Sequence, residues 1–326
     1  MEPVELRPLS LGELLDRTFR LYRDHFWLFV SIMAIPAAFS IPSQVLLLTF
    51  QGSMFSSAAQ APDRPPSIPS PGIIIGGVLV YFAFFVAFLV VYFLGVAASS
   101  SAVGDVYLGR VCTVRGSYAT IRGRFWRLIG VVFNVALRLL GLFLLVLLVL
   151  GGGMAAIGYF FGGRGGSTVF AVIFSLALIF AYIAGIAFCV YFALRYAVSV
   201  PVLMIENLGV FATIRRSVSL TRGRRGQIFL SLLVAGIIAA AGTYVLQGPF
   251  VIATIFAAAQ GHWPPWLAFA SAVAGAIGSA LTGPVSMIAI VLLYYDSRVR
   301  KEAFDLQFMM ASLDQRVSAA GTVSPA

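Results

Sequence analysis

Six long apolar stretches constrain this chain more than any other feature of its sequence. A helix that crosses a bilayer needs about 20 mostly apolar residues, and every stretch reaches that length. They run from Phe26 to Phe50, Ile73 to about Ser99, about Leu128 to Phe161, Val169 to about Val200, about Ile228 to Ala259, and Trp266 to Tyr295. The sequence therefore predicts an all-α integral membrane protein with six transmembrane helices.

The composition excludes the main soluble classes. Of 326 residues, 60% are apolar and 10% are charged, and the mean hydropathy is +0.97. Soluble domains are about half apolar and about one quarter charged, so this chain has too little polar surface for a soluble enzyme or a disordered protein. Its two cysteines, Cys112 and Cys189, are too few for a disulfide framework and are expected to be buried apolar residues.

The distribution of arginine predicts the orientation of the helices. The net charge is +10, and all but three of the 22 basic residues lie before the first stretch, between the second and third, between the fourth and fifth, or after the sixth. The positive-inside rule then places both termini in the cytoplasm. We expect a bacterial cytoplasmic (inner) membrane, no cleaved signal peptide, and anionic lipid, not nucleic acid, as the partner of these charges.

A unit of about 100 residues recurs along the chain. The segment TVRGSYATIRGRFWRLI at residues 113–129 aligns with TIRRSVSLTRGRRGQIF at residues 213–229, with six identical positions, and a weaker copy surrounds Arg23, Phe26 and Trp27. Each unit is predicted to hold a short basic amphipathic helix and two spans, in three parallel copies at about 8–108, 109–208 and 209–308. These copies make up one membrane domain, residues 1–317, followed by a disordered tail, residues 318–326. The alternative is that basic turns between helices resemble one another by composition alone.

The first short helix carries a clear start signal. Ser10 and Glu13 have the spacing of a capping box, and apolar residues then recur at helical spacing opposite a charged face. Such a helix is expected to lie in the headgroup plane at the cytoplasmic surface. Residues 303–317 repeat the pattern, whereas the Pro-rich stretch at residues 51–72 is expected to be an irregular outer connection.

Glycine, proline and other small residues predict breaks and contacts within the spans. The third and fifth apolar stretches are long enough to tilt, break or partly re-enter the membrane, and any break is expected at Gly151–Gly153 and at Gly248–Pro249. In the sixth, Ser271, Gly275, Ser279 and Gly283 recur every four residues and predict close packing against another helix. Trp263 and Trp266 are expected in an outer aromatic belt.

The sequence predicts no enzyme, cofactor or metal site. Its two histidines, His25 and His262, are expected on opposite sides of the membrane, and no His, Cys and carboxylate set has metal-ligand spacing. Lys301 follows no glycine-rich loop, and the glycines at residues 162–166 form a turn and not a dinucleotide fingerprint, because no strand pattern surrounds them.

Three sets of residues remain as structural or functional candidates. Arg138, with Asn134 one turn before it, lies about 18 Å into the third span at 1.5 Å per residue; it either reaches the interface or faces a partner or cavity. An acid ends each even-numbered span, and these acids are expected to form structural ion pairs: Asp105, Glu206 and Asp296. Six arginines of the short helices are candidate lipid ligands: Arg115, Arg122, Arg124, Arg215, Arg222 and Arg224.

Three segments together resemble one family of bacterial membrane proteins. They are LRPLSLGELLDRTFRLYRDHFWLF at residues 6–29, ENLGVFATIRRSVSLTRG at residues 206–223 and LLYYDSRVRKEAFDLQ at residues 292–307. The family is the membrane domain of glycerophosphoryl diester phosphodiesterase, and the likeness extends over essentially the whole chain. In some relatives this domain precedes a soluble phosphodiesterase domain that binds a divalent metal. The resemblance implies a membrane domain that stands alone, because no segment here matches that catalytic domain.

The sequence favours a non-catalytic protein that organises, recruits or passes anionic lipid or lipid-derived molecules. Two alternatives stay open: a small transporter with a polar path near Arg138, and a regulatory partner of a separate enzyme. A protein partner or a homo-oligomer is compatible with each of these functions.

Overall fold

The computed structural model describes residues 9–59, 71–107, 109–161, 168–260 and 264–302, and every regular element in these ranges is an α-helix. Six segments are long and apolar enough to cross a membrane, as the sequence predicts. The helices are α1 (Leu11–Asp24), α2 (Phe26–Ala59), α3 (Pro71–Tyr107), α4 (Val114–Arg122), α5 (Phe125–Phe161), α6 (Thr168–Arg195), α7 (Ser199–Glu206), α8 (Val210–Thr221), α9 (Arg225–Ala259) and α10 (Pro265–Glu302).

A short helix followed at once by a long one occurs three times: α1 and α2, α4 and α5, α8 and α9. The long helices begin at Phe26, Phe125 and Arg225, which are 99 and 100 residues apart. At matching positions, Thr18, Ser117 and Ser217 are all buried. This order agrees with the pattern of the repeat, while the threefold repeat itself stays a prediction.

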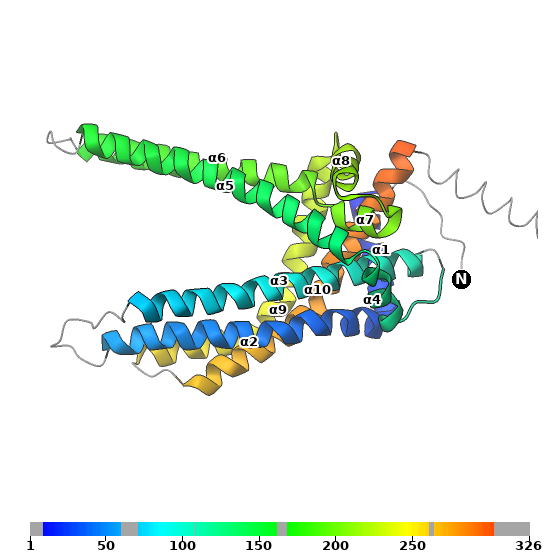
Figure 1. The fold of residues 1–326 in the computed structure, drawn as a ribbon, viewed down its shortest axis with the longest axis horizontal. Coiled ribbons are helices and arrows are strands. Elements are labelled where there is room, and N and C mark those ends of the chain that lie inside the picture. Colours follow the sequence, from blue (N-terminus) through cyan, green and yellow to red (C-terminus); the bar gives the residue numbers. More distant parts are fainter. Residues whose placement is uncertain (1–8, 60–70, 108, 162–167, 261–263, 303–326) are drawn as a thin grey trace, which may run out of the picture. The chain divides into compact units, whose positions relative to one another are not determined.

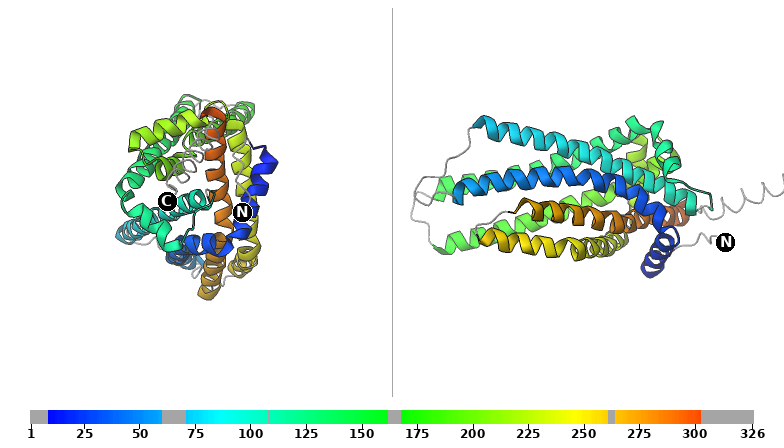
Figure 2. Two further views of the ribbon diagram at one scale, coloured as in Figure 1. Left: turned by 90° about the vertical axis from the view of Figure 1, so that its right-hand side faces the viewer. Right: turned by 90° about the horizontal axis from the view of Figure 1, so that it is seen from below.

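The described residues form two compact units, and the larger is built on α10. It comprises the chain up to Phe125 and from Leu230 onwards, with α1, α2 and α3 packed against α10. Figure 1 shows α2 and α3 side by side, and Figure 2 shows α9 running alongside α10. Tyr294, Tyr295 and Phe29 are fully buried, so the core of this unit lies around the C-terminal half of α10.

The short helix α1 is attached to this core as its sequence pattern indicates. The capping box is confirmed, because the Ser10 backbone N–H donates to Glu13 at 2.8 Å and the Glu13 N–H donates to the Ser10 hydroxyl at 3.4 Å. Leu14 and Thr18 are buried on the inner face. The hydroxyl of Tyr22 donates to the Leu281 carbonyl of α10.

Small residues let α9 and α10 approach closely, but only part of the predicted stripe takes part. A Cβ added to Gly275 would lie 2.9 Å from the Gln247 side chain, and Ser271 is buried next to Gln247. Gly283 has open space around it, and Ser279 is exposed. Gly278, which the predicted stripe omits, also lies close to α9, because a Cβ there would be 2.9 Å from the Thr243 Cα. The period of four drifts off the contact because a helix has 3.6 residues per turn.

The predicted helix breaks are wrong, and a break occurs elsewhere. Helices α5 and α9 continue through Gly151–Gly153 and Gly248–Pro249. Within lipid an unpaired backbone group costs several kcal/mol, which outweighs the roughly 1 kcal/mol penalty of a helical glycine. The fourth apolar stretch instead divides between Arg195 and Ser199, because Pro201 has no N–H to donate to the carbonyl of Ala197.

The second unit comprises residues 126–229 and therefore holds most of α5, with α6, α7 and α8. Figure 1 shows α5 and α6 as an antiparallel pair, and a Cβ added to Gly185 would lie 2.6 Å from Val146 of α5. The left-handed backbone of Asn207, with φ of 54°, ends α7. The chain then turns into α8, which packs against α6 and α7.

Several sequence predictions lie outside the described residues: residues 60–70 of the Pro-rich connection, the glycine turn at 162–166, His262, Trp263, the stretch 303–317 and the tail 318–326. The prediction of an irregular connection is wrong for residues 51–59 and 71–72, which belong to α2 and α3. The prediction for the cysteines is wrong. Cys112 and Cys189 are both partly exposed. Cys189 lies on α6, where a side chain can be apolar without being buried in protein, and Cys112 lies in the connection between α3 and α4.

Candidate functional site

Helix α4 is a short helix with sequence signals at both ends. The Thr113 side chain caps its start by accepting from the Gly116 N–H at 3.2 Å. Gly123 follows Arg122, and the Arg124 N–H donates to the Ile121 carbonyl at 2.7 Å, which closes the turn before α5. The backbone therefore changes direction between α4 and the apolar helix α5.

One face of α4 is fixed against α2 and α3. Ser117 is buried, and its carbonyl accepts from Ser101 of α3 at 3.5 Å. The Tyr118 hydroxyl donates to the Ile32 carbonyl of α2 at 2.9 Å. Burial raises the pKa of Tyr118 to about 12, so the phenol stays protonated and keeps donating at physiological pH. Ile121 is 2% exposed. Helix α4 is thus held in one rotation about its own axis.

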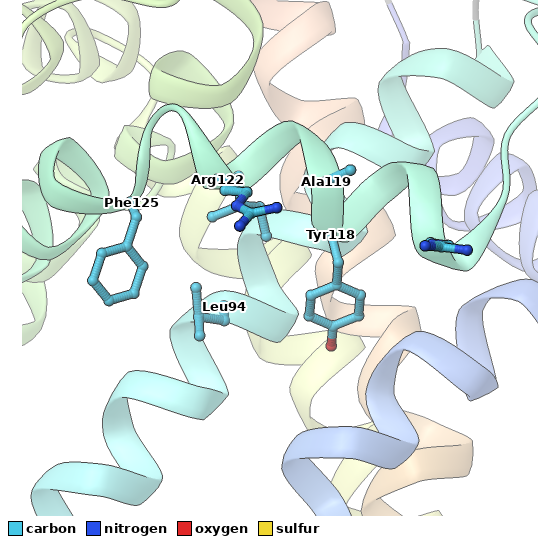
Figure 3. A pocket seen from close by; sticks show the side chains of 7 residues that line it. Leu94, Tyr118, Ala119, Arg122 and Phe125 are labelled. Atoms are coloured by element: carbon cyan, nitrogen blue, oxygen red, sulfur yellow. The ribbon is translucent and has the colours of Figure 1, made fainter.

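Next to these contacts, α4 lines a basic and apolar groove, which we call the α4 groove and to which Tyr118 and Ile121 also contribute. Its volume is about 410 Å³, and Figure 3 shows the residues that line it: Leu94, Arg115, Tyr118, Ala119, Ile121, Arg122 and Phe125. Arg115 and Arg122 are exposed. Among the described residues, neither guanidinium makes a hydrogen bond or an ion pair with protein. Arg124, the third predicted arginine of this segment, is half-exposed and lies outside the lining.

Helix α8 has the same sequence pattern but different arginine contacts. Arg215 and Arg222 are exposed, and Arg224 donates to the Gln227 side chain. Arg225 occupies the position that Phe125 has after α4. Its guanidinium carbon lies 4.4 Å from the centre of the Tyr191 ring, and it donates to the Tyr191 hydroxyl.

The three acids at the ends of even-numbered spans all contact arginine. Asp105 lies 3.8 Å from Arg110, with side chains 39% and 69% exposed. Glu206 binds Arg216 through both carboxylate oxygens, at 2.9 and 3.2 Å. Asp296 is fully buried, lies 3.0 Å from Arg300 and accepts from the Leu9 N–H at 2.8 Å. Asp296 and Arg300 thereby attach the start of the described chain to α10.

Arg138 and Asn134 lie on α5, but the structure does not bring them to either cavity described for this protein. Arg138 is exposed; it donates to the Tyr196 hydroxyl at 3.5 Å, and its guanidinium carbon lies 5.9 Å from the ring centre. The Asn134 side-chain oxygen is buried and accepts no hydrogen bond from the described residues. A second cavity, of about 280 Å³, lies in the larger unit among α2, α3, α9 and α10, lined partly by Ser40, Thr243 and Thr282.

Sequence reasoning found the arginines of the groove but missed its walls. Leu94 lies on α3, about 20 positions before α4 in the sequence, and is one of many apolar residues on that helix. Tyr118 aligns with Val218 when residues 113–129 are compared with residues 213–229. Because the two residues differ, that comparison did not indicate Tyr118 as a candidate. A polar aromatic residue between two arginines on one helix face was the available signal.

These features define the class of protein. Six helical segments long and apolar enough to cross a membrane, joined by short helices with exposed arginine, are the features of a multi-pass membrane protein. Residues 169–318 match the family model of the membrane domain of glycerophosphoryl diester phosphodiesterase, and no catalytic domain is matched. The resemblance seen in the sequence is confirmed for these residues, while the N-terminal segment lies outside the match. Neither the curated proteins nor the solved structures gave a match.

Proposed function

We propose that this protein is a non-catalytic, multi-pass protein of the bacterial cytoplasmic membrane that binds and organises anionic lipids through its short basic helices. The observation that carries the proposal is the exposed pair Arg115 and Arg122, placed immediately before an apolar helix of spanning length. Basic residues next to a membrane span attract anionic headgroups with about 1 kcal/mol each.

Exposed tryptophans support the same placement of the short helices. Trp27 is 77% exposed and Trp126 is 81% exposed, each at the start of a long apolar helix. Tryptophan favours the boundary between headgroups and hydrocarbon. The junctions of α1 with α2 and of α4 with α5 are therefore suited to the headgroup region. With the charge asymmetry of the loops, this favours the cytoplasmic leaflet and cytoplasmic termini.

The orientation can be tested by labelling introduced cysteines. In intact cells of a variant lacking Cys112 and Cys189, a cysteine at Ser67 or Gly166 should react with an impermeant maleimide, and one at Ser219 should react only after lysis. Labelling of the cysteine at position 219 in intact cells would contradict the proposed orientation.

The lipid function is tested by neutralising arginines on both short helices. The combined variant Arg122→Gln, Arg124→Gln, Arg222→Gln and Arg224→Gln should retain severalfold less anionic lipid after purification, measured by phosphate analysis of extracted lipid. Melting should change little, since Arg122 and Arg222 are exposed and surface charges contribute little to stability. Unchanged retention of anionic lipid would reject the proposed function.

A further inference from the structure

The charge in the α4 groove is divided between two separate positions. Arg115 and Arg122 are seven residues apart, which is two helical turns and about 10 Å along the axis. Tyr118 and Ala119 line the groove between them. No lining residue is acidic, so the groove carries two positive charges that the described protein leaves uncompensated.

The apolar part of the groove leads toward the spanning helices. Leu94 belongs to α3 and Phe125 is the first residue of α5, and both helices are candidate spans. A volume of about 410 Å³ is in the range of small-molecule sites, about 300 to 1,000 Å³. The groove therefore fits a molecule with an anionic head and an apolar tail that continues into the bilayer.

We infer that the α4 groove is a specific site for one phospholipid that carries two phosphate groups, a cardiolipin-type lipid, and this inference rests on the proposed function. One phosphate lies at Arg115 and the other at Arg122, because the planar guanidinium pairs with phosphate oxygens through two parallel hydrogen bonds. An acyl chain runs along Leu94 and Phe125. A lipid with a single phosphate leaves one arginine without an anion.

The test uses the purified full-length protein in mild detergent, with cardiolipin or phosphatidylglycerol added and the bound lipid counted by native mass spectrometry. Wild-type protein should bind one cardiolipin at least about tenfold more tightly than phosphatidylglycerol. The pair Arg115→Gln and Arg122→Gln should lose about tenfold in cardiolipin affinity, which corresponds to about 1.4 kcal/mol. The matched pair on α8, Arg215→Gln and Arg222→Gln, should lose clearly less cardiolipin affinity than the α4 pair, because it removes only general attraction for anionic lipid and leaves the α4 groove intact.

A second variant blocks the groove without changing its charge. Leu94→Trp should lower cardiolipin affinity to a similar extent while the melting temperature stays near that of wild type. Pyrophosphate, a soluble molecule with two phosphates, should not compete at concentrations comparable with the lipid, because it makes no apolar contact.

The outcomes separate this site from the general lipid function. Equal loss from the α4 and α8 pairs would reject the site and leave general attraction of anionic lipid in place. No loss from either pair would reject the site, and unchanged lipid retention by the combined variant above would reject the function as well. Equal affinity for both lipids, or efficient competition by pyrophosphate, would reject a two-phosphate lipid as the occupant.

Discussion

Helices α4 and α8 share a sequence pattern but use their arginines differently. In α8, Arg216 is held by both carboxylate oxygens of Glu206. In α4 the aligned residue is Gly116, and the acid at the end of the preceding helix, Asp105, makes only a long contact with Arg110, 3.8 Å away. Within the described ranges of the chain, the α4 arginines at the groove have no carboxylate partner.

The residue that follows each short helix reinforces this difference. Phe125 gives the α4 groove an apolar wall, whereas Arg225 places a charge at the matching position, and Tyr191 binds that charge. Two copies of one pattern can therefore serve two purposes. One pairs its arginine with Glu206, and the other leaves Arg115 and Arg122 exposed at the groove.

The largest expected effect is on stability, and it concerns the acid beside α8. Glu206→Gln removes a charge-assisted pair whose side chains are 15% and 28% exposed, so it should lower the free energy of unfolding by about 2 kcal/mol. Thermal melting of the purified protein measures this loss. The matched control is Asp105→Asn, whose pair is long and exposed and should cost less than about 0.5 kcal/mol. Similar losses in the two variants would remove the distinction between the helices.

Exchanging Phe125 and Arg225, the matching residues after α4 and α8, should have a smaller effect, and this effect is on lipid affinity. Phe125→Arg adds a positive charge but removes the apolar wall, and it should weaken cardiolipin binding about fivefold, or about 1 kcal/mol. Binding governed by charge alone predicts the opposite sign. Arg225→Phe, the reverse change next to α8, should leave cardiolipin binding unaltered. Lipid titrations followed by native mass spectrometry give both values.

The smallest expected effect is at Arg138 in the second unit. Its hydrogen bond to Tyr196 is long and the side chain is exposed, so Arg138→Gln should change the free energy of unfolding by less than about 1 kcal/mol. Tyr196→Phe, which removes the same hydrogen bond, should give a similar value in the same melting assay. If Arg138→Gln instead abolished binding of a small anion while Tyr196→Phe did not, the transporter interpretation would replace the present one.

The sequence was a good guide to the helices and a partial guide to the candidate site. The apolar stretches, the capping box of α1 and the arginines of α4 could all be found, because each depends on neighbours within a few positions. The break before α7 was missed, although Pro201 was visible, because a proline near a helix end and a proline inside a helix look the same in one sequence. Gly278 was missed because the predicted stripe followed a period of four.

The sequence by itself determined that this protein is an α-helical membrane protein with short basic helices next to its spans. The lengths of the apolar stretches and the positions of the arginines are enough for this, because both are local properties of the chain. Tertiary structure alone decided which arginines are available. Whether Arg115, Arg122 or Arg216 has a partner depends on where Glu206, Leu94 and Phe125 come to lie. Those positions follow from how α4 packs on α2 and α3 and how α8 packs on α6 and α7. Side-chain pairing acts over a few ångströms between helices, and no spacing along the chain encodes that distance.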